Sequence, residues 1–279
     1  MSNPLLICTD LDRTLLPNGV QQESPGVRVH FHRLAQDPNT IIVYATGRDK
    51  TLVDEAIAQY QLPLPDYLIA DVGSSIYSRD GEQWVQWQGW RERLRQDWDG
   101  YSREQMSRLF PLSEQVTAQD EFHQGEFKLS FMIEPVEALE GVLAEYEQII
   151  QDNELRCHCI ASENEYDNHG LIDILPTQAN KLYALEYVIE QMALDPNQVL
   201  FSGDSGNDIQ VLASHFPSVL VANATETIKS KAIAMAKQQG NSDALYLAKG
   251  ESPELNGCYS AGIIEGLHHF FPQFRFELT

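Results

Sequence analysis

The stretch that decides the fold is Leu5-Leu6-Ile7-Cys8-Thr9-Asp10-Leu11-Asp12-Arg13-Thr14, near the start of the 279-residue chain. Its first five residues form a nearly continuous apolar run, which predicts a short strand buried on both faces. Asp10 and Asp12 come directly after this strand. Ligands of an open parallel sheet bind beyond the carboxyl ends of its strands, so both aspartates are candidate functional residues. On their own they could instead cap a helix, which aspartate does readily.

Two more apolar runs end in polar clusters. Residues 41–45 are followed by Thr46-Gly47-Arg48, and residues 199–202 by Gly203-Asp204-Ser205-Gly206-Asn207-Asp208. Further strands are expected at 67–70, 171–175 and 218–222, and helices at 25–36, 50–61, 181–192 and 260–270. This alternation predicts an α/β fold with a Rossmann-like parallel sheet and helices on both of its faces.

The middle of the chain follows another pattern. Apolar and polar residues alternate over 127–133, which indicates a half-buried antiparallel strand. Apolar residues recur every three or four positions over 136–150, which indicates an amphipathic helix. We therefore expect an inserted α+β cap domain at 81–169, with the catalytic core formed by 1–80 and 170–279. Tryptophans cluster in this insert and are interpreted as core residues, with sugar stacking as the alternative: Trp84, Trp87, Trp90 and Trp98.

Composition excludes several classes of function. The chain has 41 acidic and 19 basic residues, and its net charge of −22 repels nucleic acids and anionic membranes. No apolar stretch is long enough to span a bilayer, and the first residues do not resemble a secretory signal. The four cysteines suit a reducing compartment, so we expect a cytoplasmic protein. We also expect a monomer, since no exposed apolar helix demands a partner. Cys157-His158-Cys159 lacks the second cluster that would complete a tetrahedral metal site.

The strand-end carboxylates imply a metal ion. Asp10, Asp12, Asp204 and Asp208 are expected to lie together, and four like charges at close range require a cation. Oxygen ligands combined with a substrate phosphate favour Mg²⁺. A carboxylate can attack phosphorus as a nucleophile, and a second carboxyl two residues away can serve as acid and base.

Other residues could bind the phosphate. Thr46 offers a hydroxyl, and Gly47 lets a backbone N–H approach closely. Lys181, at the start of an expected helix, offers a positive charge. Together they would stabilise charge on a phosphoryl group during its transfer.

The ordered motifs resemble those of the haloacid dehalogenase (HAD) superfamily of phosphatases. The four motifs are Asp10-Leu11-Asp12-x-Thr14, Ala45-Thr46-Gly47-Arg48, Asn180-Lys181 and Gly203-Asp204-Ser205-x-Asn207-Asp208. The insert resembles the cap of the Cof-like (IIB) branch. Within that branch the chain is most similar to the sucrose-6-phosphate phosphatases, in stretches such as Val72-Gly73-Ser74-x-Ile76-Tyr77, Lys128-Leu129-Ser130-Phe131 and Asp173-Ile174-Leu175-Pro176.

The resemblance implies a role for each motif. Asp10 would be the nucleophile and Asp12 the acid/base. Mg²⁺ would be held by the Asp10 carboxylate, the Asp12 backbone carbonyl and Asp204, with Asp208 or Asn207 in support. Thr46, Gly47 and Lys181 would bind the phosphate, and Arg48 and Lys128 are candidate substrate contacts. Arg13 stands where the superfamily often has Gly or Asn.

A sugar phosphate is the expected substrate, such as sucrose-6-phosphate or a mannosylglycerate- or mannosylfructose-type phosphate. Association with a sugar-phosphate synthase is left open. A phosphomutase is the first alternative, but it would need an arginine-rich second phosphate site in the cap. Arg91, Arg93 and Arg95 are two apart on a helix and do not share one face. A non-catalytic sugar-phosphate-binding regulator is the second alternative, which the intact motif residues argue against.

Overall fold

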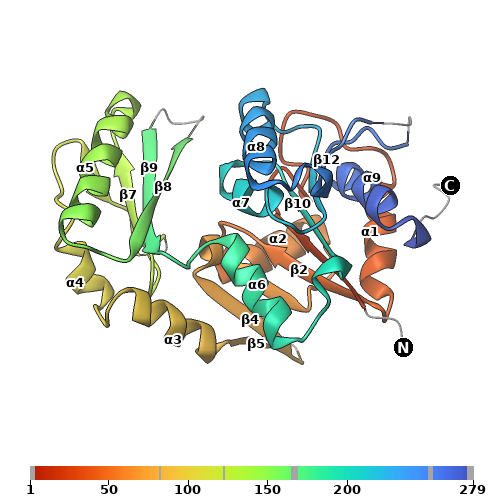
Figure 1. Ribbon diagram of the computed structural model, residues 1–279, viewed down its shortest axis with the longest axis horizontal. Helices are drawn as coiled ribbons and strands as arrows, with labels where there is room; N and C mark the ends of the chain where they lie inside the picture. The colour runs from red at the N-terminus through yellow and green to blue at the C-terminus, as the bar shows by residue number, and fades with distance from the viewer. Residues whose placement is uncertain (1–3, 82, 122, 165–168, 251–253, 275–279) are drawn as a thin grey trace.

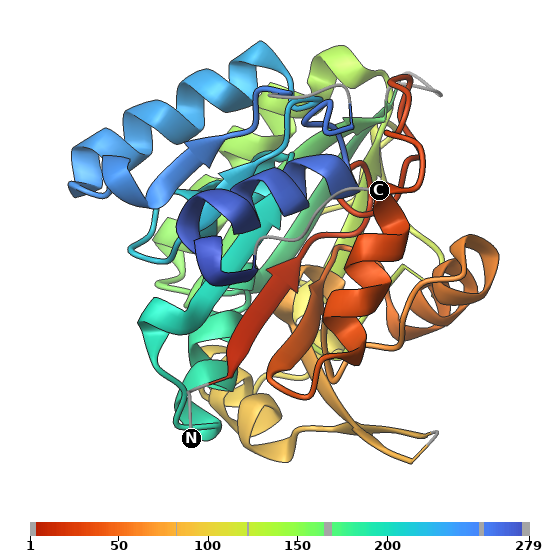
Figure 2. The ribbon, with the colours of Figure 1, turned by 90° about the vertical axis from the view of Figure 1, so that its right-hand side faces the viewer.

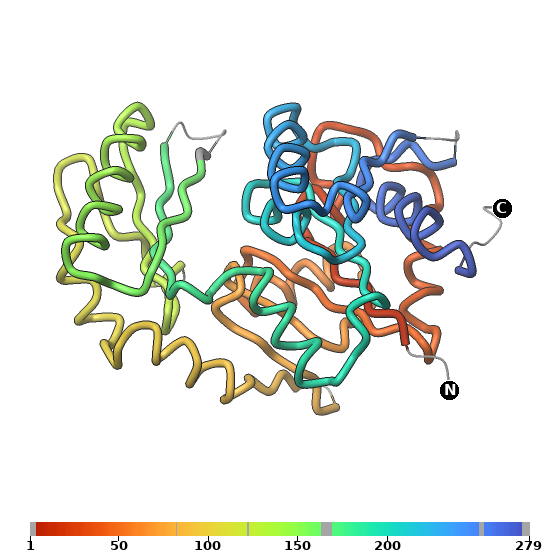
Figure 3. The backbone as a smooth tube through the Cα atoms, viewed as in Figure 1, coloured from red at the N-terminus to blue at the C-terminus, as the bar shows by residue number. Residues whose placement is uncertain are grey.

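The computed structural model describes residues 4–81, 83–121, 123–164, 169–250 and 254–274. These residues form a larger and a smaller lobe, seen at the right and left of Figure 1, and the backbone trace in Figure 3 shows the segments that connect them. Among the described residues, no helix combines the length and the apolar character needed to cross a membrane.

The larger lobe contains an eight-stranded sheet in the order β12-β11-β10-β1-β2-β3-β4-β5. Neighbouring strands from β12 to β3 are parallel, whereas β4 and β5 add an antiparallel hairpin at one edge. This confirms the predicted α/β class. The strands are β1 (Leu5–Thr9), β2 (Thr40–Ala45), β3 (Tyr67–Ala70), β4 (Ser75–Asp80), β5 (Gln83–Gln86), β10 (Val199–Gly203), β11 (Ser218–Leu220) and β12 (Leu245–Leu247).

Helices cover both faces of this sheet because the buried strands are apolar on both sides. Alternate residues of β1 enter different cores: Leu5 and Ile7 pack in one, Leu6 and Cys8 in the other. The first core includes residues of α1 (Val27–Gln36), α2 (Lys50–Tyr60) and α9 (Ser260–Phe270). The second includes residues of α6 (Lys181–Gln191), α7 (Ile209–Leu212) and α8 (Glu226–Gln239). Figure 2 shows α1 and α9 side by side on one face.

The smaller lobe contains a four-stranded antiparallel sheet in the order β6-β7-β9-β8. Its strands are β6 (Val116–Ala118), β7 (Leu129–Ile133), β8 (Cys157–Asn164) and β9 (His169–Pro176). The helix α5 (Leu139–Asp152) packs on β8 and β9. Two further helices, α3 (Gln88–Asp97) and α4 (Arg103–Ser107), lie between β5 and β6 in the chain.

The expectation that residues 171–175 belong to the parallel core is wrong. They form part of β9, which pairs antiparallel with β7 and β8. Burial alternates along β9: Gly170, Ile172 and Ile174 are buried, whereas Leu171 and Asp173 are partly exposed. Such alternation is typical of an antiparallel strand with one covered face. The sheets therefore place 169–176 with the smaller lobe and 83–86 with the larger one.

Candidate active site

Strand ends bring three predicted motifs together. The central strand β1 pairs with β10 on one side and β2 on the other, all in parallel. Asp10 follows β1, Asp204 follows β10 and Thr46 follows β2, so the three residues lie at one edge of the sheet. The backbone N–H of Asp10 donates to the carbonyl of Ser202 at 2.9 Å, which continues the pairing of β1 with β10 to this edge.

Three buried carboxylates form a tight cluster at this edge. One oxygen from each of Asp10, Asp204 and Asp208 lies within 4.8 Å of the other two. Asp208 is fixed through Oδ2, which accepts from the backbone N–H groups of Asp204 (3.1 Å) and Ser205 (3.0 Å). Gly203 is required by this packing, since a Cβ there would lie 2.5 Å from Cγ of Asp208.

Lys181 is the counter-charge of the cluster. Its Nζ lies 2.7 Å from Oδ1 of Asp10 and 2.7 Å from Oδ1 of Asp208. The lysine is 1% exposed and is the first residue of α6. The Asn180 side chain caps that helix by accepting from the N–H of Tyr183.

One lysine does not neutralise the cluster. Burial raises the pKa of Asp10 well above its usual range, and although Lys181 lowers it, Asp208 and Asp204 raise it further. Burial and the nearby Asp208 raise the pKa of Asp204 to about 7. The raised pKa values show that negative charges in this cluster repel one another. A hard divalent cation bound by their oxygens would offset that repulsion. The donor set therefore fits Mg²⁺.

The expected fourth carboxylate points elsewhere. Asp12 pairs with Arg48, whose Nε donates to Oδ2 at 2.7 Å and whose Nη2 donates to Oδ1 at 2.6 Å. Asn18 donates to the same Oδ1 at 2.6 Å. Burial raises the pKa of Asp12, but the hydrogen bonds from Arg48 outweigh it and the net pKa is lowered. Arg48 and Asn18 thus hold Asp12 as a partly exposed carboxylate outside the cluster of Asp10, Asp204 and Asp208.

The second motif borders the site. Thr46 is fully buried, and its hydroxyl oxygen accepts from the N–H of Arg48 at 3.2 Å. A Cβ at Gly47 would lie 3.9 Å from Nδ2 of Asn207, which brings the second and fourth motifs side by side. That is an ordinary contact, so the protein's own packing does not require glycine there.

Several contacts were not found from the sequence. The Thr14 hydroxyl donates to Oδ1 of Asp204 at 3.2 Å, and Arg13 Nε lies 3.5 Å from Oδ2 of the same aspartate. Lys128 reaches from the smaller lobe to Asp71 of the larger one, with Nζ 3.2 Å from Oδ1. Asp71 follows β3, so the strand-end rule that selected Asp10 would have selected it too.

A cavity of about 590 Å³ adjoins the aspartate cluster and lies between the lobes. One wall comes from α5 and β8, the other from the segments after β1 and β10 and from α8. Its lining residues are Arg13, Leu139, Glu140, Leu143, Ala161, Ser162, Asp204, Ser205, Gly206, Thr225, Ile228 and Lys231. The tryptophans Trp90 and Trp98 are buried core residues and none of the four lines this cavity.

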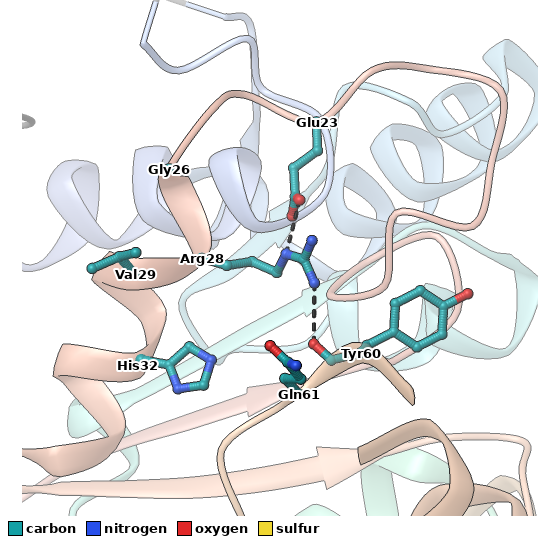
Figure 4. A pocket seen from close by; sticks show the side chains of 7 residues that line it. All are labelled: Glu23, Gly26, Arg28, Val29, His32, Tyr60 and Gln61. Atoms are coloured by element: carbon teal, nitrogen blue, oxygen red, sulfur yellow. Dashed lines mark hydrogen bonds and ion pairs between the residues drawn. The ribbon is translucent and has the colours of Figure 1, made fainter. Parts of the chain in front are cut away.

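A second pocket lies apart from the site, beside α1 and the end of α2 (Figure 4). Its central side chain, Arg28, points to Glu23 and to the carbonyl of Tyr60, at 2.8 and 3.1 Å. Both interactions are internal to the fold, so this arginine has a structural explanation.

The parallel sheet, the strand-end aspartate and the buried lysine beside it agree with membership of the HAD superfamily, to which the sequence comparisons assign the chain. A family model described as sucrose-6F-phosphate phosphohydrolase matches residues 3–271, and the chain belongs to that family. The resemblance proposed from the motifs is thereby confirmed.

Individual relatives agree with this assignment. A HAD-like hydrolase of Nitrosococcus oceani is 42% identical over 99% of this chain and 74% of its own length. Sucrose-phosphatase 1 of Nicotiana tabacum is 28% identical over 95% of this chain, which spans only 59% of the tobacco protein. The crystal structure of the sucrose-phosphatase of Synechocystis sp. PCC6803, in complex with sucrose and phosphate, shares the fold with a TM-score of 0.75. It is 24% identical, and the match covers 96% of this chain and 98% of that one.

Proposed function

We propose that the protein is a Mg²⁺-dependent phosphatase that hydrolyses a sugar phosphate, such as sucrose-6-phosphate, through an aspartyl-phosphate on Asp10. The observation that supports it most is the position of Asp10. Its carboxylate lies at the carboxyl end of the central strand, 2.7 Å from the buried Lys181 ammonium and within the three-carboxylate cluster.

In the first half of the reaction, an Asp10 oxygen attacks phosphorus and the bond between phosphorus and the sugar oxygen breaks. Asp12 donates a proton to that leaving oxygen. Arg48 favours the ionised form of Asp12, so before it can donate, Asp12 must leave Arg48 and take up a proton from solvent, which it then passes to the leaving oxygen. Lys181, the Thr46 hydroxyl and the Gly47 N–H would stabilise charge on the transferring group.

In the second half, the Asp12 carboxylate accepts a proton from water, which attacks phosphorus and releases phosphate from Asp10. The pairing with Arg48 holds Asp12 in the ionised form that this step uses. Asp10, Asp204 and Asp208 would hold Mg²⁺, with Asn207 and the Asp12 carbonyl in support. When bound, the ion would act as a Lewis acid on the phosphoryl oxygens.

We propose that the smaller lobe, residues 88–176, is the cap that selects the substrate. Its α5 and β8 face the larger lobe across the cavity of about 590 Å³, which has both apolar and polar walls. Sugars present both kinds of surface, so the alcohol part of the substrate would lie here. The proposed cap differs from the expected range of 81–169 at both ends. It begins after β5, which belongs to the sheet of the larger lobe, and it includes β9, which belongs to the sheet of the smaller lobe.

The arginines of α3 do not favour a phosphomutase. Arg91 and Arg95 both contact Glu126, and Arg93 lies over the ring of Tyr187. A second phosphate site would require these side chains to converge on a shared cavity. Arg91 and Arg95, four residues apart on α3, instead converge on one carboxylate that offsets their charge, and Arg93 points away from them to Tyr187.

A panel of sugar phosphates assayed with Mg²⁺ tests the proposal, with sucrose-6-phosphate compared with simple hexose monophosphates. Phosphate release is expected to be fastest with a disaccharide or glycoside phosphate, and to disappear in Asp10→Asn and with EDTA. Asparagine keeps the size of the side chain, so folding is preserved. Phosphate release that survives Asp10→Asn would overturn the proposed chemistry.

A further inference from the structure

An ion pair outside the aspartate cluster joins the two lobes. Lys128 belongs to the smaller lobe, directly before β7, and Asp71 begins the turn that follows β3 in the larger lobe. Nζ of Lys128 lies 3.2 Å from Oδ1 of Asp71, and their side chains are only 9% and 12% exposed. Because both charges are largely removed from water, the loss of either one would leave the other buried and poorly solvated.

The turn that presents Asp71 has an unusual backbone. Asp71, Val72 and Gly73 have φ angles of 50°, 59° and 98°, all in the left-handed region. A β-branched valine there is an outlier, and such conformations persist only where the surroundings enforce them. The N–H of Asp71 donates to the carbonyl of Arg48, and that of Val72 to the carbonyl of Thr46, both at 3.0 Å. The turn is therefore locked to the second motif.

The same turn also contacts the third motif. A Cβ at Gly73 would lie 2.4 Å from the backbone of Asn180, the residue that caps the helix of Lys181. The Gly73 carbonyl accepts from the indole N–H of Trp90 in α3, at 3.0 Å. One turn thus contacts the expected phosphate-binding segments and, through Asp71 and through the bond from Trp90, the cap.

We propose that Asp71 is a positioning residue: by pairing with Lys128 it fixes the cap against the turn beside Thr46, so that the cleft closes over Asp10. This inference rests on the proposed function, in which the cleft receives the sugar. From the sequence, Lys128 was expected to contact the sugar. In this proposal, Lys128 fixes the cap instead.

The charges around the pair explain why closure would depend on it. Burial raises the pKa of Asp71; Lys128 lowers it, and the nearby Asp49 and Asp173 raise it. Asp173 is on β9 of the cap and Asp49 is in the larger lobe, so acidic groups from both lobes face each other here. Lys128 offsets this repulsion only while the lobes are closed.

The pair should matter for large substrates and not for small ones. A disaccharide phosphate contacts both walls of the cleft, whereas p-nitrophenyl phosphate needs only the groups around Asp10. Loss of a buried partner should therefore lower kcat/KM for sucrose-6-phosphate by about tenfold or more, and change that for p-nitrophenyl phosphate by less than about twofold.

Asp71→Asn is a suitable test because asparagine has the same shape and tolerates a positive φ. Lys128→Met and the variant that carries both substitutions complete a double-mutant cycle. We expect the double variant to resemble either single variant, because the two residues act through one contact. Glu126→Gln is the matched control: it neutralises a carboxylate in the loop that carries Lys128, but its partners are Arg91 and Arg95 of α3.

A readout without turnover separates this inference from the proposed function. Small-angle X-ray scattering should show a more extended molecule for Asp71→Asn than for the wild type or Glu126→Gln. Equal losses on both substrates, additive effects in the cycle, or unchanged scattering would each overturn the positioning role. Failure of the wild type to hydrolyse any phosphate ester would overturn the proposed function and leave the scattering result to decide this inference.

Discussion

Replacement of Lys181 by methionine should damage stability and activity together. Methionine keeps most of the aliphatic stem and removes the ammonium that lies 2.7 Å from Asp10 and 2.7 Å from Asp208. Both carboxylates are buried, so the variant leaves them without their cation. Removal of one partner of a buried ion pair costs about 3–5 kcal/mol of unfolding free energy, and we expect a loss in this range in metal-free buffer. Protonation of Asp10, whose pKa is already raised, limits the loss.

The same substitution removes a donor from the transferring phosphoryl group. Loss of one such preorganised donor lowers kcat by about 10²–10³, and we expect a fall of that size. Urea unfolding in EDTA and phosphate release with Mg²⁺ measure the two effects.

Lys229→Met is the matched control for both measurements. It removes a lysine whose partner, Glu226, is 88% exposed, and should cost less than about 1 kcal/mol while activity is kept. If Lys181→Met unfolds like this control and keeps activity within about tenfold of wild type, the role of Lys181 is refuted.

Three further outcomes are expected. Arg48→Met should lower kcat by about tenfold or more with little change in KM, measured by steady-state kinetics, because the acid/base carboxylate loses both guanidinium hydrogen bonds. Gly73→Ala should lower the unfolding free energy by more than about 1 kcal/mol, since φ is 98° and the added Cβ meets the Asn180 backbone; Gly141→Ala, in open space within α5, should instead stabilise by about 0.5–1 kcal/mol. Burial raises the pKa of the Cys157 thiol from 9.0 to about 12, so the folded state disfavours the thiolate. The stability that the neutral thiol contributes is complete below pH 9 and is lost as the pH rises toward 12, by less than about 1.4 kcal/mol per pH unit. In urea titrations, the difference in unfolding free energy between wild type and Cys157→Ala should therefore be constant below pH 9 and shift against the wild type above it.

Much of the core could be predicted from residues that follow apolar runs. Asp10, Thr46 and Asp204 each come after a strand buried on both faces, and parallel strands end at one edge of a sheet. Lys181 was predicted to belong to the site because it lies in the third of four motifs that occur in a fixed order. By itself, a lysine at the start of a helix would look like a solvated surface residue. Its complete burial depends on tertiary packing and has no local signal.

Other features depend on partners distant in the chain. The sequence pattern did not indicate that the carboxylate of Asp12 would leave the cluster for Arg48, because that choice is set by the loop after β2. Residues 171–175 look like a core strand by their apolar content, and Asp173 is the one polar side chain among them that indicates a sheet covered on a single face. The contact of Lys128 with Asp71 depends on how the two lobes meet, which no local period specifies.

The identity of the nucleophile is tested most directly by trapping the covalent intermediate. Asp12→Asn removes the base that would hydrolyse it, so mixing this variant with sucrose-6-phosphate and Mg²⁺, followed by acid quench and peptide mass spectrometry, should show one phosphoryl group on Asp10. The same experiment with Asp10→Asn should show none. A phosphoryl group on another residue, or phosphate release by Asp10→Asn at the wild-type rate, would contradict the mechanism.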